Sequence, residues 1–584
     1  MKIKKLLALL LVGVFLLCAF AACDTEPAPD SSADAPASSD GNGEEASTGD
    51  SSADSPADES ADDVSTPDEG STLPSDAISS PESSSGGNST NKPSSGGNNS
   101  TTANTTKPSS GGTTVEQMPH FNVKDYGAKA NGKTDDAPAI KKAIEAAKAV
   151  NGGIVYLPAG QYLMNSGVDV PMCVTVRGEN PTTKKKWRAV DDLSNTKITY
   201  ESTGTAWLDA ANFSGTWIIV NHGAGDVDAH ATFQMEGNAS IYGLGFVHKE
   251  TAPITNKITV YPPAIAIKST KEIPFVRDGM TIENINLLNA YVGIGTQAGN
   301  GKLLDHEIGA DPSKYLYSLG RMRVHNVTGG CVYRGIVMKA LLDTVDLQNI
   351  RFGYTNLSKT YATQRAQNCA DFEWYRADGS NAANIFSFGA KYGILTTPSY
   401  ISGSASMRLS AAELIGQYPL YATASGQYEV ADCTFTTMDF NGLAKEKDFR
   451  ALTIIQDATS VHQPFYLFNN CVLENKVQSA SANDYNLYLV TKQPTATAMV
   501  QFSDLTFKGW SPDSTDPVIY YEATGSGYGG FALFQDCKAE GGNASSGMLY
   551  KAVNISKGGL QFNSCDFPQG LIDRSAESDT VWFQ

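Results

Sequence analysis

A short template recurs along the chain, and it limits the possible folds more than any other feature of the sequence. Each copy has an apolar residue second, Asn, Asp or Ser fourth, and an apolar residue or Cys fifth. The copies read TIENINL (281–287), RVHNVTG (323–329), DLQNIRF (346–352), EVADCTF (429–435), LFNNCVL (467–473), QFSDLTF (501–507), LFQDCKA (533–539) and QFNSCDF (561–567). Alternating strands that meet at a small polar turn residue, unit after unit, are typical of a solenoid of parallel strands.

The template also assigns roles to residues that otherwise resemble catalytic groups or metal ligands. We interpret Asp432, Asp504 and Asp536 as turn residues, because they share their position with Asn. The cysteines at the fifth position are predicted to be buried free thiols rather than disulfides or metal ligands, and they are Cys433, Cys471, Cys537 and Cys565. The nine cysteines include no C-x-x-C pair, and the seven histidines show no ligand spacing, so no metal site is predicted.

A helix is predicted near the start of this region, in GKTDDAPAIKKAIEAAKAVNGGIVYLPAGQY (132–162). Asp135 and Asp136 are adjacent carboxylates, but they precede an amphipathic stretch and are expected to stabilise a helix N-terminus rather than to catalyse. The predicted apolar stripe consists of Ile140, Ala143, Ile144 and Ala147. A helix of this kind can cover the open end of a solenoid, and IVYLPAGQY then reads as a strand, a turn and the start of another strand.

The N-terminal segments indicate export. Residues 1–23, MKIKKLLALLLVGVFLLCAFAAC, combine three lysines with a short apolar run, as signal peptides do. The alanines before Cys23 resemble a bacterial lipoprotein processing site, so we expect Cys23 to be lipidated and to anchor the protein outside the cell. Ordinary cleavage and secretion is the alternative.

A linker and one folded domain are expected to follow. Residues 24–117 are low in large apolar residues and hold 18 acidic and two basic side chains, so we expect a disordered linker. Residues 118–584 are predicted to form one β-helix domain. They are close to neutral and contain no basic cluster, which argues against nucleic-acid binding.

Residues 121–163, FNVKDYGAKANGKTDDAPAIKKAIEAA...GGIVYLPAGQYL, resemble the N-terminal signature of the pectate-lyase-like superfamily, in the rhamnogalacturonase/epimerase-like group. The resemblance implies an all-β, single-stranded, right-handed parallel β-helix with an N-terminal capping α-helix, acting on carbohydrate polymers by hydrolysis or β-elimination. The catalytic set of polygalacturonase-type relatives is absent: no Gly precedes His222 in NHGAGD (221–226), and no Asp-Asp pair follows it. No catalytic residue is therefore carried over from that family.

The sequence nevertheless indicates where a substrate would bind. In similar folds, strands such as YVGIGTQ (291–297), VYRGIVMK (332–339) and KYGILTT (391–397) line the substrate cleft. Two insertions, residues 298–321 and 354–383, are expected to form its walls. The second supplies Asp371 and Glu373 as candidate catalytic carboxylates, with Trp374 and Tyr375 to stack on sugar rings. A solvated loop with one packed Trp is the alternative reading.

The segment RGIVMKALLDTVDLQN (334–349) supplies the other candidates. With Ile336, Met338 and Leu347 pointing inward, strand alternation directs Lys339 and Asp346 outward, beside turns that carry Arg334 and Asp343. Coil register predicts that Asp346 stacks next to Arg323, followed by Thr281. The catalytic candidates are therefore Asp343, Asp346, Asp371 and Glu373, and the substrate-binding candidates are Arg334, Lys339, Trp374 and Tyr375.

These features favour an extracellular glycoside hydrolase that acts on a pectin-like or other glycan and is held at the membrane by its lipid anchor. One alternative is a lyase of uronate-containing glycans, with Lys339 or Arg334 as base and calcium as a cofactor. Another is a non-catalytic surface protein that binds glycans. The sequence does not indicate an oligomeric state.

Overall fold

The computed structural model describes residues 118–183, 208–252, 254–269, 279–298, 321–339, 341, 344–353, 358–375, 377, 379–397, 405–423, 426–456, 465–477, 484–491, 499–510, 516–523, 531–542, 545, 547–555, 558–573, 575 and 580–584. The predicted signal peptide (1–23) with Cys23, the predicted linker (24–117), Asp343 and most of the expected insertion 298–321 lie outside the described residues.

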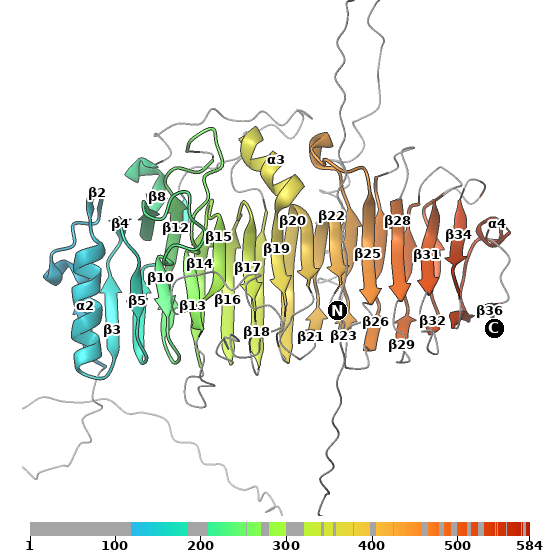
Figure 1. The fold of residues 1–584 in the computed structure, drawn as a ribbon, viewed down its shortest axis with the longest axis horizontal. Coiled ribbons are helices and arrows are strands. Elements are labelled where there is room, and N and C mark those ends of the chain that lie inside the picture. The colour runs from blue at the N-terminus through green and yellow to red at the C-terminus, as the bar shows by residue number, and fades with distance from the viewer. Residues whose placement is uncertain are drawn as a thin grey trace, which may run out of the picture. The chain divides into compact units, whose positions relative to one another are not determined.

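The chain folds as a right-handed parallel β-helix (Figure 1), as the sequence predicted. Each coil passes through sheets that we name A, B and C. The chain leaves sheet A through a sharp turn, continues into sheet B, and crosses to sheet C before it returns to sheet A in the next coil. The pairings within these sheets are parallel, and the antiparallel exception in the described part is β7 (Thr182–Thr183) with β8 (Phe213–Ser214).

Sheet A stacks β1 (His120–Asn122), β3 (Gly153–Leu157), β6 (Val174–Gly178), β11 (Ser240–Tyr242), β14 (Thr281–Leu287), β16 (Met322–Gly329), β18 (Val345–Phe352), β20 (Ser380–Thr396), β21 (Ala405–Ser410), β23 (Gly426–Ala431), β26 (Phe465–Asn469), β29 (Met499–Ser503), β32 (Phe531–Gln535), β35 (Gly559–Asn563) and β36 (Val581–Phe583). The strands β14, β16, β18 and β20 bend and continue into sheet B.

Sheet B adds β2 (Asn131–Asp135), β4 (Gly160–Met164), β9 (Thr216–Val220), β12 (Leu244–His248), β22 (Glu413–Ala422), β24 (Thr434–Thr437), β27 (Val472–Asn475), β30 (Thr506–Lys508) and β33 (Lys538–Glu540). Sheet C contains β5 (Val168–Val170), β10 (Phe233–Met235), β13 (Ile265–Ser269), β15 (Val292–Ala298), β17 (Arg334–Met338), β19 (Ala370–Trp374), the later parts of β20 and β22, β25 (Phe449–Gln456), β28 (Asp484–Thr491), β31 (Pro517–Ala523) and β34 (Met548–Val553).

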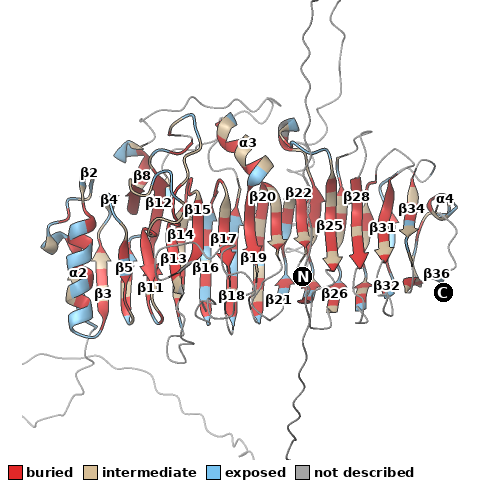
Figure 2. Cartoon of the chain, in the orientation of Figure 1, coloured by how far each residue is buried: buried red, intermediate tan, exposed pale blue. Residues whose placement is uncertain are grey.

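Apolar side chains stacked in register form the interior core, as the template predicted. On sheet A, the second template position is buried in every copy: Ile282, Val324, Leu347, Val430, Phe468, Phe502, Phe534 and Phe562. Figure 2 shows the buried inner positions along the strands of the solenoid. The predicted free thiols are also confirmed: Cys433, Cys471 and Cys537 are buried, Cys565 is half-buried, and none of them forms a disulfide.

The fourth template position forms the turn between sheets A and B. All eight predicted residues have left-handed backbone angles, with φ between 50° and 57° for Asn284, Asn326, Asn349, Asp432, Asn470, Asp504, Asp536 and Ser564. Asn and Asp tolerate this region better than other residues with a Cβ. The side chains stack as a ladder, because Asn384 Nδ2 donates to Asn349 Oδ1 at 2.6 Å and Asn349 Nδ2 donates to Asn326 Oδ1 at 3.2 Å.

The structure adds two members to this turn that the template did not detect. Asn384 (φ 53°) and Ala411 (φ 51°) occupy the same turn in the coils between Asn349 and Asp432. The segment around Asn384, NAANIFS (381–387), fits the template with a small alanine at the second position, whereas Ala411 itself departs from it, because MRLSAAEL (407–414) carries Ala where the template has Asn, Asp or Ser.

Helix α2 (Ala137–Ala149) covers the N-terminal end of the solenoid, and its predicted stripe is buried at Ile140, Ala143, Ile144 and Ala147. Asp135 Oδ1 accepts from Ala137 N at 3.1 Å, as expected for a residue at a helix start. Asp136 acts differently: it is buried and its carboxylate accepts from the backbone amides of Lys129 and Ala130 in the preceding loop.

Short helices complete the described structure. Helix α3 (Lys359–Asn368) packs on β20, and α4 (Gln569–Ile572) lies by β34 near the other end of the solenoid (Figure 1). The 3₁₀ turns are η1 (Val123–Tyr126), η3 (Ala210–Asn212) and η6 (Phe440–Gly442). Within the described residues, no helix is both long and apolar enough to span a membrane.

Candidate functional site

The sequence-predicted residues Arg334 and Glu373 form an ion pair on the outer side of sheet C. The Arg334 Nε donates to Glu373 Oε2 at 2.6 Å, and its Nη1 donates to the carbonyl oxygens of Tyr333 and Asn368. Burial lowers the pKa of Arg334, but the charge of Glu373, the neighbouring Tyr333 and the hydrogen bond to Glu373 together outweigh burial and raise the pKa above its ordinary value. The guanidinium is therefore charged and held in place by neighbouring strands.

Two further predicted residues lie at the ends of the same strands. Lys339, directly after β17, places its Nζ 4.2 Å from the ring centroid of Tyr375, directly after β19. The Arg334 guanidinium lies 3.9 Å from the centroid of Tyr333, whose ring stacks on Tyr291 at 5.1 Å. Cationic and aromatic groups suit contact with a sugar polymer, but Lys339 is only 5% exposed and Glu373 only 4%, so the half-buried Arg334 and Tyr375 are the predicted residues here that present surface to a ligand.

Asp371 is not on a surface loop, as the sequence reading expected, but on strand β19 beneath helix α3. Its side chain is fully buried and accepts from Arg365 Nη2 at 2.9 Å and from Ser387 Oγ at 2.7 Å. Arg365 is equally buried. A substrate cannot reach this carboxylate while α3 is in place, so Asp371 is not part of the candidate site.

The expectation that Trp374 is available to stack on a sugar is wrong. Trp374 is 0% exposed and belongs to the interior core, where its ring stacks on Phe372 at 5.8 Å. Residues 370–374 form a strand rather than an insertion. Alternation within that strand directs Phe372 and Trp374 inward and Glu373 outward.

Asp346 lies on a different face from the other candidates. It pairs with Arg323 in the register of sheet A, and Arg323 pairs with Thr281, both as predicted. Its carboxylate interacts with His325 Nε2 at 2.9 Å. Because Glu373 is on sheet C, and Asp343 lies outside the described residues, the structure does not bring the four predicted carboxylates together.

A cluster of tyrosines that sequence reasoning missed continues the Arg334–Glu373 face toward the C-terminus. In the coil-to-coil register of sheet C, Arg334 aligns through β19 with Tyr392, which pairs with Tyr418 in the following coil. Glu373 aligns through β20 with Tyr421 in the same way. In the next coil, β25 carries Arg450 and Thr453 at the corresponding positions, and tyrosines return in β28 and β31. We name this set the tyrosine strip: Tyr392, Tyr418, Tyr421, Tyr485, Tyr488 and Tyr520.

The strip is held together by ring contacts. Tyr392 stacks on Tyr418 with ring centroids 5.2 Å apart, and Tyr488 stacks on Tyr520 at 4.8 Å. Burial is the first cause that raises the pKa values of Tyr418, Tyr488 and Tyr520, and that of Tyr520 rises to about 12. These hydroxyls are therefore neutral hydrogen-bonding groups at ordinary pH.

An ion pair lies among these tyrosines. Arg450 Nε donates to Asp448 Oδ1 at 3.0 Å and its Nη2 donates to Oδ2 at 2.8 Å, while the guanidinium lies 3.8 Å from the centroid of Tyr488. Burial raises the pKa of Asp448, and the opposing charge of Arg450 does not cancel this. A carboxyl group whose pKa is raised is suited to donate a proton in catalysis.

Further carboxylates lie at the same edge of sheet C. Asp448 immediately precedes β25, Asp484 begins β28 opposite Phe449, and Asp516 immediately precedes β31. The amide of Asp484 donates to Asp516 Oδ2 at 3.3 Å. The charge of Asp516 also contributes to the raised pKa of Asp448, so these carboxyl groups interact electrostatically.

This arrangement can bind a polymer and transfer protons. A sequence signal for it exists in hindsight: YPLY (418–421) and YNLY (485–488) share the spacing Y-x-x-Y on sheet C strands. Among the residues that the structure describes, no group of three or more His, Cys, Asp or Glu side chains could hold a metal ion.

Comparisons with known proteins agree with the fold. Residues 120–231 match the family model described as rhamnogalacturonase A/epimerase, pectate lyase-like, so the predicted resemblance is confirmed for that part of the chain. Alginate lyase 7 of Azotobacter vinelandii is 57% identical over 47 residues, which cover 8% of this chain and 6% of that protein. The chain thus spans only a small fraction of this relative.

The solved structures to which the chain is similar include the A-module of mannuronan C-5 epimerase AlgE4 from Azotobacter vinelandii. It is 12% identical, with a TM-score of 0.36, over 80% of this chain and 97% of that one. The catalytic unit of GH87 α-1,3-glucanase from Streptomyces thermodiastaticus is 13% identical, with a TM-score of 0.38, over 81% of this chain and 71% of that one.

Proposed function

We propose that this protein, which resembles the pectate-lyase-like superfamily over residues 120–231, is an enzyme that cleaves a polysaccharide bound along the outer face of sheet C. The observation that carries the proposal is the Asp448–Arg450 pair set among the tyrosines of the strip. Successive coils are about 4.8 Å apart, so a strip that crosses several coils matches an extended chain better than a compact ligand. The names of the matched family and of alginate lyase 7 point to polysaccharides as well.

Hydrolysis fits the charged groups of the strip. Asp448 has a raised pKa and is placed to protonate a glycosidic oxygen as the leaving group departs. Asp516, two coils further along sheet C, is the candidate for the second carboxylate that activates water or attacks the sugar. Two coils correspond to about 9.6 Å at the backbone, which is at the upper limit of the roughly 6.5–9.5 Å between the carboxyl groups of inverting glycosidases, so this spacing favours activation of water over attack on the sugar.

Elimination of a uronate is less well supported. A lyase needs a side chain that removes a proton from the sugar ring, and the sequence offered Lys339 or Arg334. Arg334 has a raised pKa and is bound to Glu373, and the pKa values of Tyr418 and Tyr488 are raised rather than lowered. None of these three groups is poised as a base at neutral pH.

The proposal is tested by Asp448→Asn, with Asp432→Asn as the matched control. Asp432 is an exposed turn residue at a position that Asn also occupies, so its substitution is expected to leave turnover unchanged. Loss of a general acid lowers kcat by about 10²- to 10⁴-fold. The assay follows reducing ends released from a polysaccharide panel, together with ultraviolet absorbance from unsaturated sugars.

Each outcome separates the alternatives. Reducing ends without unsaturated products, lost in Asp448→Asn only, support hydrolysis. Unsaturated products show a lyase instead. Retention of a polysaccharide without cleavage by the parent chain shows a binding protein, and equal activity of Asp448→Asn and the parent shows that the catalytic residues lie elsewhere.

We further propose that the enzyme acts outside the cell and is anchored through Cys23. The support is the sequence of residues 1–23 alone. Incorporation of labelled fatty acid into the parent chain but not into Cys23→Ser is the expected result. Release of an unlabelled, cleaved protein into the medium shows ordinary secretion.

A further inference from the structure

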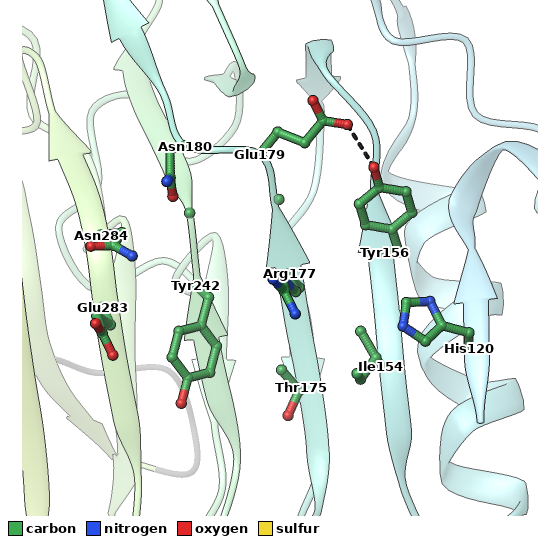
Figure 3. Close-up of a pocket in the computed structure, with 12 residues that line it drawn as sticks. His120, Ile154, Tyr156, Thr175, Arg177, Glu179, Asn180, Tyr242, Glu283 and Asn284 are labelled. Atoms are coloured by element: carbon green, nitrogen blue, oxygen red, sulfur yellow. Dashed lines mark hydrogen bonds between the residues drawn. The ribbon is translucent and has the colours of Figure 1, made fainter. Parts of the chain in front are cut away.

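A groove of about 730 Å³ lies on the outer face of sheet A, over the N-terminal coils. It crosses β1, β3, β6, β11 and β14, and so belongs to a different face from the sheet C strip. Figure 3 shows the lining side chains, with Arg177 between Tyr156 and Tyr242 and with Glu283 beyond Tyr242.

Register explains this order. Tyr156 pairs with Arg177, Arg177 with Tyr242, and Tyr242 with Glu283, so the four side chains form one row along the solenoid axis. Coils about 4.8 Å apart give this row a length of about 14 Å. An elongated ligand along the axis would contact all four.

The groove is hollow because glycine follows the row in two adjacent coils. Gly178 and Gly243 supply no side chain where neighbouring coils carry Asn284 and other turn residues. A Cβ at Gly178 would lie 2.6 Å from the carbonyl oxygen of Gly243, and Gly243 has a φ of 68°. Packing and backbone geometry thus keep both positions as glycine.

The lining offers hydrogen-bond donors, acceptors and aromatic faces together. Tyr156 donates to Glu179 Oε1 at 2.6 Å, and Glu283 accepts from Asn326 at 3.3 Å. Arg177 is exposed and lines the groove, where its guanidinium adds hydrogen-bond donors. Sugar hydroxyls both donate and accept, so they match this mixture.

The balance of charge selects among carbohydrates. The groove is lined by the cationic Arg177 and by two carboxylates, Glu179 and Glu283, so it has no excess of positive charge. The carboxylates of a polyanionic glycan would be repelled by Glu179 and Glu283, and this repulsion would weaken binding. A neutral oligosaccharide would stack on Tyr156 and Tyr242 and hydrogen-bond to the charged side chains without that repulsion.

We propose that this sheet A groove is a second carbohydrate-binding site, specific for a neutral oligosaccharide segment. The suggested role of the groove rests on the proposed function: it would hold the enzyme on its polymer while cleavage takes place on sheet C. Binding itself depends only on the sheet A side chains.

The test measures binding of neutral hexasaccharides to the full chain by calorimetry, with cellohexaose, laminarihexaose and maltohexaose as probes and hexagalacturonate as the acidic comparison. The variants are Tyr242→Ala and Arg177→Ala. The controls are Trp582→Ala and Arg408→Ala, which remove exposed side chains from sheet A strands outside the groove, β36 and β21. Thermal melting confirms that each variant is folded.

We expect at least one neutral probe to bind, with about tenfold weaker binding in each groove variant and no change in the controls. Absence of binding by every neutral probe, equal binding in Tyr242→Ala and the parent, or preference for hexagalacturonate would overturn the proposal.

Failure of this inference and failure of the proposed function give different results. If Asp448→Asn abolishes turnover but no neutral probe binds the groove, the function stands and the inference fails. If the groove binds a neutral probe but the chain cleaves no polysaccharide, the inference stands and the function fails.

Discussion

Substitution of Arg365 tests whether Asp371 has a structural or a catalytic role. Arg365 Nη2 donates to Asp371 Oδ2 at 2.9 Å and to the carbonyl oxygen of Phe388 at 3.2 Å, and Nη1 donates to that of Cys331 at 2.5 Å. Arg365→Met removes these bonds and leaves the buried Asp371 carboxylate without its counter-ion. Removing one partner of a buried ion pair costs about 3–5 kcal/mol. We expect the free energy of unfolding to fall by that amount.

A double-mutant cycle gives the sharper measurement. Asp371→Asn alone leaves the Arg365 charge buried and is expected to cost a similar amount. The double variant leaves neither charge, so its destabilisation should be smaller than the sum by about 0.5–3 kcal/mol. Denaturant unfolding supplies the free energies, and hydrogen exchange of residues 358–374 shows whether α3 loosens.

Activity decides the role of Asp371. If it is structural, the folded fraction of each variant turns over substrate at the parental kcat. Parental stability combined with lost turnover in Asp371→Asn would refute the structural reading and return this carboxylate to the catalytic site.

Other predictions concern the turn ladder, the thiols and the pH dependence. Asn349→Val places a β-branched residue at φ 55° and removes two ladder bonds, so we expect a loss of about 1–3 kcal/mol in thermal melts, with Asn349→Gly closer to the parent. Cys433 is buried, and its hydrogen bond with Cys471 followed by burial raises its pKa, so a thiol reagent should label the exposed Cys173 in the native chain and Cys433 only after unfolding. Burial raises the pKa of Asp448, so activity that needs its proton should decline as pH rises through that pKa, and the declining limb should be absent from the residual activity of Asp448→Asn.

The turn residues show which features of the coil can be predicted from nearby sequence alone. Asn349 and Asp432 could be identified because each turn needs a residue that tolerates a left-handed backbone, and this need repeats in every coil. Ala411 escaped notice, because the neighbouring coils hold that turn in a conformation its own sequence does not favour. Local sequence also misidentified the role of Asp136. It resembles a helix cap, but in the folded chain its carboxylate accepts hydrogen bonds from the amides of Lys129 and Ala130.

The sequence reading proposed the sheet C strands that carry Arg334 and Glu373, but it did not identify the other residues of the candidate site. Strand alternation correctly directed Glu373 outward once β19 was recognised as a strand, but the sequence reading treated residues 354–383 as an insertion. Trp374 was therefore placed outside when it lies in the core, and Asp371 was placed in solvent when it lies beneath α3.

The sequence by itself determined the coil: its inward apolar positions, its Asn turns and its capping helix. These features depend on residues close together in the chain, and each coil repeats them. Only the tertiary structure decided which outward side chains meet, because that depends on how loops of unequal length bring distant strands into register. Tyr392 and Tyr520 belong to one strip, and Arg177 lies between Tyr156 and Tyr242, through stacking that the template does not encode.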